Sequence, residues 1–325
     1  MALNKMRRGP DPSPPANIMP TAFVHHRDCT LHDMGSHHPE CPARIAAIED
    51  HLLATGILEH LVDVSAPSAT REQLLRVHDP DYVDAIEASA PERGFVHLDP
   101  DTAMNPHSHH AALRAAGAVV KATDMVVGNE VENAFCCVRP PGHHAARARA
   151  MGFCLFNNVA VGAAHAMEKH GLERVAIVDF DVHHGNGTED IFRDDPRVMM
   201  VSTFQHPFYP YSGVEGRSDR MVNIPLAAYS DGGQFRDAVE KFWIPALERF
   251  RPQMAFISAG FDAHRDDDMA ALNLVESDYA WVTERLVVYA DRFCGGRIVS
   301  TLEGGYELDA LARSVAVHLR ALARL

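Results

Sequence analysis

The chain has 325 residues, of which 46% are hydrophobic and 23% are charged, a composition typical of a soluble globular protein with a large core. Its 44 acidic and 30 basic residues give a formal net charge of −14, which argues against nonspecific nucleic-acid binding and mildly favours cationic substrates. No apolar run reaches the roughly 20 residues that a membrane span needs, and the six cysteines form no CxxC pair. We therefore expect a cytoplasmic protein that binds neither nucleic acid nor membranes.

Residues 1–20 contain two arginines and several prolines but no apolar signal core. This composition predicts a flexible tail or a surface arm rather than a secretion signal. The remaining residues, 21–325, show no internal repeat and no composition break. We expect them to form one domain.

Apolar runs and helical periodicities alternate along those residues. Strands are predicted at residues 21–24, 133–138, 175–180, 198–203, 221–225, 254–259 and 297–302. Helices are predicted at residues 42–55, 111–127, 158–170, 234–250, 278–293 and 308–325. This alternation indicates βαβ crossovers and a parallel sheet that carries helices on both faces.

The segment VAIVDFDVHHGNGT, at residues 175–188, ends a buried strand in alternating polar residues. Period two places Asp179, Asp181 and His183 on one face at the carboxyl end of that strand. Carboxylate oxygen and imidazole nitrogen suit a divalent metal of zinc type, and three protein ligands leave a position open for water. The strand in QMAFISAGFDAH supplies Asp262 as the third candidate ligand.

Two further segments end apolar runs in polar side chains. VRPPGHHA places His143 and His144 after a Pro-Pro-Gly turn, and TLEGGYEL places Tyr306 after two glycines. Loops at the carboxyl ends of parallel strands line the ligand crevice, so these segments are expected to converge on the metal.

These motifs occur together with HPECPARIAAIEDHL, VHDPDYVDAI and GFCLFNNVAVGAAHA, in a fixed order from about Thr21 to the C-terminus. The chain thereby resembles the zinc-dependent histone deacetylase family, which includes bacterial deacetylase-like amidohydrolases and acetylpolyamine amidohydrolases. HGNGT with LEGGY resembles its class II branch. The resemblance implies a single α/β catalytic domain over residues 21–325, with an eight-stranded parallel sheet flanked by helices on both faces, as in arginase.

The resemblance also implies residue roles. Asp181, His183 and Asp262 would bind one catalytic zinc ion, with ferrous iron in the cell left open. His144 would act as general base and acid, His143 would pair with Asp179, and Tyr306 would donate a hydrogen bond to the oxyanion. Asn186 stands where class I members carry an aspartate beside the second histidine, so we expect His144 to be less basic here.

A substrate channel and two potassium sites follow from the same resemblance. The channel would be formed by Gly152, Phe153 and Tyr209, with Phe208 as an alternative to Tyr209. Asp101 would lie at its rim, although helix capping or a surface turn explains this residue equally well. The inner cation site would comprise Asp179, Asp181, His183, Ser202 and Thr203, and the outer one the backbone carbonyls of Phe192, Asp195 and Val198.

The resulting hypothesis is metal-dependent hydrolysis of an acyl amide, on an acetylated lysine peptide or a similar small acetylated amine, by metal-activated water. Acetylpolyamine hydrolysis is the main alternative. Met269 stands where a polyamine-selective branch has a glutamate, which weighs against it, but the acidic run 266–268 either forms a solvated turn or faces the rim. Gly185 and His264, where a dimanganese ureohydrolase would carry extra aspartates, oppose that alternative. A noncatalytic acyl-lysine binder would lack a ligand, histidine or tyrosine, and none is missing. Acyl-chain preference and self-association are left open.

Overall fold

Short runs of buried aliphatic and aromatic residues form the strands of a central parallel sheet. The structure is a computed structural model that describes residues 19–215 and 218–325. The strands of this sheet are β1 (Thr21–His25), β2 (Leu61–Ser65), β5 (Asn133–Cys137), β6 (Val175–Asp179), β7 (Val198–Gln205), β8 (Met221–Leu226), β9 (Met254–Ala259) and β10 (Ile298–Leu302). Their order is β2-β1-β5-β10-β9-β6-β7-β8, and every pairing is parallel. The expected eight-stranded sheet is confirmed.

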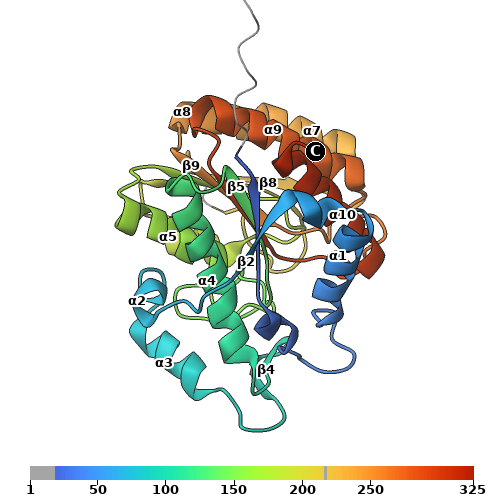
Figure 1. Ribbon diagram of the computed structural model, residues 1–325. Coiled ribbons are helices and arrows are strands. Elements are labelled where there is room, and N and C mark those ends of the chain that lie inside the picture. Colours follow the sequence, from blue (N-terminus) through green and yellow to red (C-terminus); the bar gives the residue numbers. More distant parts are fainter. Residues whose placement is uncertain (1–18, 216–217) are drawn as a thin grey trace, which may run out of the picture.

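Helices cover both faces of the sheet (Figure 1). The longer ones are α1 (Ala43–Ala54), α4 (Ser108–Val127), α5 (Asn158–His170), α9 (Glu276–Phe293) and α10 (Leu308–Ala323). Shorter ones are α2 (Arg71–Leu74), α3 (Pro80–Ala88), α6 (Asn186–Phe192), α7 (Gly232–Ala238) and α8 (Ile244–Phe250), and a π-helical turn, η3 (Val239–Trp243), joins α7 to α8. None of the helices in the described ranges is long and apolar enough to cross a membrane.

Alternate residues of each strand feed two separate hydrophobic cores. Val24 and Cys136 pack with α4 and α5 on one face, while Phe23 and Phe135 pack with α1, α9 and α10 on the other. A strand buried on both faces must be apolar throughout, which explains the continuous apolar runs in the sequence.

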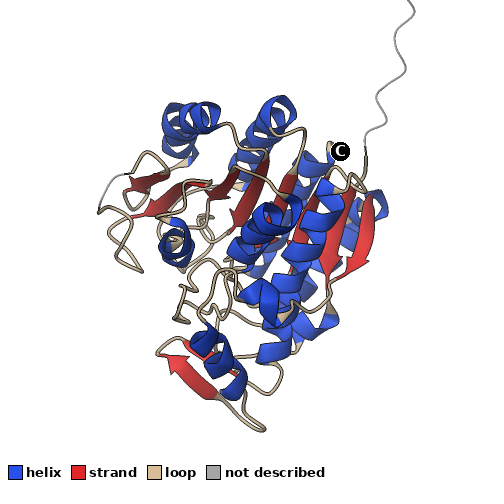
Figure 2. Ribbon diagram, turned by 90° about the vertical axis from the view of Figure 1, so that its left-hand side faces the viewer, coloured by secondary structure: helices blue, strands red, loops and turns tan. Residues whose placement is uncertain are grey.

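A two-stranded antiparallel hairpin lies apart from the main sheet. It pairs β3 (Val96–Asp99) with β4 (Thr102–Met104), and Figure 2 shows it at the foot of the molecule. Asp101 lies in its turn. The predicted tail, residues 1–20, falls outside the described residues except for its last two.

The strand order decides where the polar segments meet. His143 and His144 follow β5, Tyr306 follows β10, Asp262 follows β9, and Asp181 follows β6. These four strands are neighbours in the order β5-β10-β9-β6. Because parallel strands end at the same edge, the segments converge there.

Candidate active site

Asp181, His183 and Asp262 form a compact, buried donor cluster. His183 Nδ1 lies 3.0 Å from Asp181 Oδ1 and 3.2 Å from Asp262 Oδ2. Backbone amides hold both carboxylates: the His183 N–H donates to Asp181 Oδ1 over 2.8 Å, and the Val182 N–H donates to Asp262 Oδ1 over 2.9 Å. The three side chains are therefore brought together as the sequence predicts, with their donor atoms facing one another.

This cluster fits a divalent cation. Asp262 Oδ2 is buried and accepts no well-aligned hydrogen bond among the described residues, its near neighbour His183 Nδ1 lying 3.2 Å away, as expected of an oxygen reserved for a metal. The glycine at 304 lets the backbone approach closely, because a Cβ there would overlap Asp262 Oδ2, and the Gly304 N–H donates to Asp181 Oδ2 over 2.9 Å. One imidazole and two carboxylates make a zinc-type donor set with room for a further ligand.

The electrostatics of the cluster favour a positive charge. Burial disfavours the imidazolium form of His183, but the hydrogen bond with Asp181 and the adjacent carboxylate of Asp262 outweigh burial and raise the pKa of His183 to about 10. Two buried carboxylates this close need a compensating cation, and a divalent metal supplies it.

His143 lies behind the cluster, between carboxylates. Its Nδ1 is 3.0 Å from Asp179 Oδ2, and its Nε2 is 3.7 Å from Asp181 Oδ1. Burial opposes its charged form, but the carboxylates of Asp181 and Asp179 prevail and raise the pKa of His143 well above its ordinary value. Glu303 fixes the turn beneath it by accepting from the N–H groups of Gly142 and His143, over 2.6 and 3.1 Å.

His144 sits in a different environment although it adjoins His143. Its Nδ1 donates to Asn186 Oδ1 over 2.7 Å, and the amide carries no charge that would stabilise an imidazolium. Burial, and then the neighbouring His143 and His183, lower the pKa of His144 well below its ordinary value. The neutral His144 ring carries its proton on Nδ1, which donates to Asn186, and Nε2 is left free to accept a proton, as general base catalysis requires.

Tyr306 is held by two charged side chains. The guanidinium of Arg44 lies 4.9 Å from the centre of its ring. Asp267 Oδ2 accepts from the N–H groups of Tyr306 and Glu307, over 2.6 and 3.1 Å. Burial raises the pKa of the Tyr306 hydroxyl well above its ordinary value, so this hydroxyl stays protonated and available as a donor.

Asp267 is thus the buried member of the acidic run, whereas Asp266 and Asp268 are exposed. The sequence predicts that this run either forms a solvated turn or faces the rim, and neither alternative describes Asp267. Its carboxylate faces the backbone of Tyr306 and Glu307 instead of solvent or the rim, because the loop after β9 packs against the loop after β10.

A cavity of about 280 Å³ leads to the cluster. Aromatic side chains form much of its wall. Phe153 lies edge-on to Tyr306 with 5.8 Å between ring centres, Tyr209 lies edge-on to His144 at 5.3 Å, and Phe208 stacks on His183 at 5.7 Å. Both alternatives for the second wall residue, Phe208 and Tyr209, therefore line the cavity.

Gly152 and Asp101 shape the other wall. Gly152 has φ +56, and a Cβ there would overlap the His144 ring, so the position requires glycine. Asp101 Oδ1 accepts from the Gly152 N–H over 3.2 Å and from the Thr102 hydroxyl over 2.9 Å. Met269 also lines the cavity, and among the described lining residues Asp101 is the one carboxylate.

The position of His38 in an early loop predicts a surface or loop-packing role, and sequence reasoning missed its place beside the channel. His38 Nε2 donates to the Asp101 carbonyl over 3.2 Å, and its ring lies edge-on to Phe153 at 4.6 Å. It also missed the buried network in which Glu40 pairs with Arg44 and Arg139 beneath Tyr306. Glu40 precedes the helix that carries Arg44, so helical spacing gives no reliable signal for this pair.

The expected inner cation set gathers beside the metal cluster. Asp179 pairs with Ser202 in the register of β6 and β7, and Thr203 follows it. Ser202 is fully buried, and its hydroxyl has no hydrogen-bond partner among the described residues. A buried hydroxyl without a partner, opposite a buried aspartate, fits a monovalent cation.

The described residues hold one other His/Asp cluster. Asp124 Oδ1 lies 2.7 Å from Nε2 of both His165 and His170. Arg76 Nη1, however, lies 2.6 Å from His165 Nδ1. A guanidinium only donates hydrogen bonds, so His165 Nδ1 is the acceptor from Arg76. The proton of His165 is therefore on Nε2, which donates a hydrogen bond to Asp124. The cluster is therefore a hydrogen-bonded tie between α4 and α5.

Comparison with known protein families gives a match to the histone deacetylase domain over residues 38–322. The chain belongs to the histone deacetylase family. It is accordingly a hydrolytic deacetylase of a metal-dependent family.

Particular relatives agree with this assignment. The histone deacetylase-like amidohydrolase of Pseudomonas aeruginosa is 37% identical over 313 residues, covering 88% of this chain and 81% of that protein. The polyamine deacetylase HDAC10 of Mus musculus is 37% identical over 331 residues, covering 94% of this chain but 48% of that protein. The crystal structure of the HDA15 HD domain superposes with a TM-score of 0.88 at 32% identity, covering 94% of this chain and 88% of that one.

All six cysteines are unpaired thiols. Cys154, next to the channel residue Phe153, is fully buried, and burial raises its pKa well above the ordinary value. A neutral buried thiol is a poor nucleophile, so Cys154 is a packing residue rather than a redox sensor.

Proposed function

We propose that this deacetylase removes acetyl or similar small acyl groups from the side-chain amine of acyl-lysine, using one zinc ion. The proposal rests above all on the Asp181, His183 and Asp262 cluster at the foot of an aromatic cavity, with His144 and Tyr306 beside it. When bound there, a divalent cation supplies a Lewis acid for the amide carbonyl and lowers the pKa of a water molecule.

The chain's own residues divide the remaining work. His144, neutral and with Nε2 free, takes a proton from the attacking water and returns it to the leaving amine. The pair of His143 and Asp179 does not stabilise an imidazolium at His144, because His143 lowers the pKa of that ring, so the main role of the pair is to orient the site. Tyr306 donates its hydroxyl proton in a hydrogen bond to the substrate oxygen as negative charge develops there.

The cavity lining supports an aliphatic acyl-lysine stem. Phe153, Phe208 and Tyr209 offer apolar ring faces, and Met269 extends this apolar surface. A polyamine would need carboxylates to bind its distal ammonium group, and Asp101 alone among the described lining residues provides one. That carboxylate already accepts from Gly152 and Thr102.

Acetylpolyamine hydrolysis is the second candidate. Two observations favour it: the net charge of −14, and the similarity to a relative named as a polyamine deacetylase. Since the cavity itself offers a distal ammonium little, we place acyl-lysine first. A reducing compartment, and hence the cytoplasm, is proposed because all six cysteines are unpaired.

Release of acetate by the zinc-loaded protein tests the proposal, with an acetyl-lysine peptide and acetylputrescine compared at equal concentration. We expect the peptide to give the larger kcat/KM, and His144→Ala to reduce turnover of both substrates by at least about a hundredfold. Faster turnover of acetylputrescine would favour the second candidate. If neither substrate is hydrolysed above the His144→Ala background, both substrate assignments are wrong.

A melting curve of His144→Ala separates chemistry from folding. Because the ring makes one side-chain hydrogen bond, to Asn186, the variant is expected to retain a cooperative transition. Tyr306→Phe removes only a hydroxyl and provides a second, milder test of the same site.

A further inference from the structure

The turn between α6 and β7 is where the family resemblance predicts an outer potassium ion. The expected ligands are the backbone carbonyls of Phe192, Asp195 and Val198. In the structure the turn is closed by its own hydrogen bonds: the Asp195 N–H donates to the Phe192 carbonyl over 3.0 Å, and the Val198 N–H donates to the Asp195 carbonyl over 3.2 Å.

A side chain from another strand already reaches these carbonyls. Arg220 Nη1 donates to the carbonyl of Asp195 over 2.5 Å and to that of Val198 over 3.3 Å, and its Nη2 donates to the carbonyl of Arg193 over 3.1 Å. Two of the three expected ligands are thus bound by one guanidinium. A planar fork with several N–H donors is suited to such converging carbonyls.

Arg220 is also fixed at its other end. It directly precedes β8, and its carbonyl accepts from the Met200 N–H of β7 over 2.8 Å. The side chain is half-buried, so it lies across the turn rather than in free solvent. Its backbone and guanidinium together connect β8 to the start of β7.

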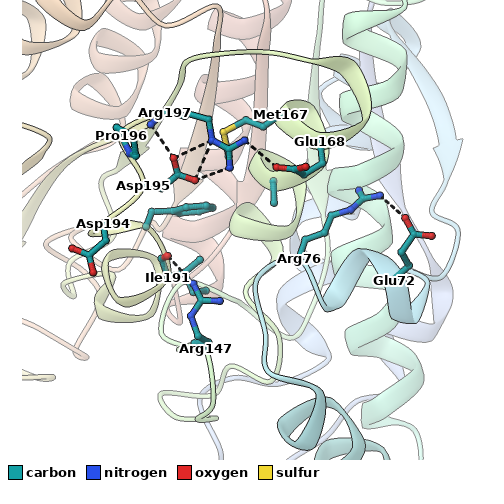
Figure 3. A pocket seen from close by; sticks show the side chains of 12 residues that line it. Glu72, Arg76, Arg147, Met167, Glu168, Ile191, Asp194, Asp195, Pro196 and Arg197 are labelled. Carbon is teal, nitrogen blue, oxygen red and sulfur yellow. Dashed lines mark hydrogen bonds and ion pairs between the residues drawn. The ribbon is translucent and has the colours of Figure 1, made fainter.

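The Asp195 carboxylate in the turn is already paired. Arg197 binds the Asp195 carboxylate through Nη2 at 2.8 Å and Glu168 through Nη1 at 2.9 Å. Figure 3 shows these interactions beside a broad cavity of about 910 Å³, with the Asp195 side chain directed toward Arg197. The Asp195 carboxylate is therefore already neutralised by Arg197. The Asp195 carbonyl already accepts two hydrogen bonds, one from the Val198 N–H and one from Arg220.

We propose that the guanidinium of Arg220 takes the place of the outer monovalent cation in this chain. It supplies one positive charge to the carbonyls that would otherwise bind potassium. A potassium ion on the same oxygens would lie about 4 Å from the guanidinium, and repulsion at an effective dielectric constant of about 20 weakens its binding roughly a thousandfold.

The inner cation set differs from the outer one because a ligand oxygen is left without a hydrogen-bond partner. The Ser202 hydroxyl has no partner among the described residues, and the buried Asp179 lies opposite it in the register of β6 and β7. Monovalent cation dependence should therefore reside in the inner set alone. This inference concerns ion content and stability, so it stands or falls independently of the substrate.

Anomalous diffraction from crystals of the metal-loaded protein grown in rubidium chloride tests the proposal directly. We expect a rubidium peak beside Ser202 and the Arg220 guanidinium at the carbonyls of Asp195 and Val198. A rubidium peak bonded to those two carbonyls in the unmodified protein would overturn the proposal.

Thermal unfolding in potassium chloride, against choline chloride at equal ionic strength, provides the second measurement. In choline chloride, Arg220→Ala should melt about 4–8 °C below the unmodified protein, because it loses charge-assisted hydrogen bonds. Potassium should raise the melting temperature of Arg220→Ala more than that of the unmodified protein.

Arg193→Ala is the matched control, because it removes an arginine of the same turn whose side chain is 54% exposed but keeps the Arg193 carbonyl. Its response to potassium should equal that of the unmodified protein. If Arg220→Ala folds poorly, Arg220→Lys replaces it in this test. Because lysine keeps the charge without the planar fork, potassium should raise its melting temperature less than that of Arg220→Ala. An identical potassium response in the unmodified protein and both Arg220 variants would contradict the proposal.

Discussion

Asp267→Asn is expected to impair catalysis by displacing Tyr306 while leaving the metal cluster intact. The Asp267 carboxylate accepts three backbone hydrogen bonds: Oδ2 from Tyr306 and Glu307, and Oδ1 from Met269 over 3.0 Å. An asparagine of the same shape has one acceptor oxygen, so its amide group must face at least one N–H donor. Either the Tyr306 side or the Met269 side of the loop then loses its partner.

The size of the effect follows from this lost bond. Leaving a buried donor unsatisfied costs about 1–3 kcal/mol. If that cost appears as displacement of the Tyr306 hydroxyl from the developing oxyanion, kcat falls by about 10- to 100-fold. KM should change by less than about threefold, because the hydroxyl acts mainly in the transition state.

Steady-state kinetics in a double-mutant cycle with Tyr306→Phe isolate this positioning role. Asp267→Asn should have little further effect on kcat once the hydroxyl is gone. Asp266→Asn is the matched control, because the Asp266 side chain is 46% exposed and pairs with Arg313 at the surface over 3.4 Å. An equal loss of kcat with and without the Tyr306 hydroxyl, or a lower melting temperature at unchanged kcat, would refute the reasoning.

Three further predictions concern the channel, the buried network and the metal. Met269→Glu, which adds a carboxylate to the cavity lining, should raise the kcat/KM ratio of acetylputrescine to acetyl-lysine peptide by at least about tenfold; an unchanged ratio in paired assays would show that residue 269 does not contact the distal amine. Burial alone would raise the pKa of Glu40, but Arg139, His32 and Arg44 outweigh burial and hold that pKa well below 4.5. The Glu40 carboxylate therefore stabilises the fold above pH 4.5, and this contribution is lost as the pH falls. Denaturant titrations should therefore show Glu40→Gln to be about 3–5 kcal/mol less stable than the unmodified protein at pH 7, with the gap narrowing below pH 4.5; a constant gap would count against the assignment. Chelation should lower the melting temperature, and zinc at a thousandfold excess over its Kd should restore about 4 kcal/mol, but not in Asp262→Asn; an equal response of that variant would place the metal elsewhere.

The strand predictions succeeded where the strand carries an apolar run. All seven predicted strands correspond to strands of the sheet: six are buried almost throughout, as helices on both faces require, and the seventh, β8, is a partly exposed edge strand that still carries apolar residues. The eighth, β2, escaped prediction because none of its five residues is buried and Asp63 stands at its centre. Its place in the sheet is set by pairing with β1, which no local pattern reveals.

One predicted helix, residues 234–250, is divided in the structure. A π-helical turn at Val239–Trp243 separates α7 from α8, and Pro245 stands in the first turn of α8. Hydrophobic periodicity tolerates such a turn because apolar residues on either side still face the core. The extent of the helical region was predictable, but the change in its hydrogen bonding was not.

The site residues divide in the same way. The convergence of Asp181, His183 and Asp262 was predictable because each follows an apolar strand, and strand ends meet at one edge. The direction of Asp267 was not identifiable, because it depends on a contact with Tyr306, 39 residues away. The engagement of Arg220 likewise depends on a strand that lies beside β7 only in the folded chain.

The separation of the β3–β4 hairpin from the main sheet bears on how such an enzyme diversifies. Donor atoms at the metal cluster depend on the register of β6, β9 and β10, and a one-residue slip there would turn the ligands away. Asp101 belongs to a hairpin that shares no strand pairing with that sheet. Insertions or replacements in the hairpin can therefore reshape the mouth of the cavity under separate selection, while the chemistry at its foot is inherited unchanged.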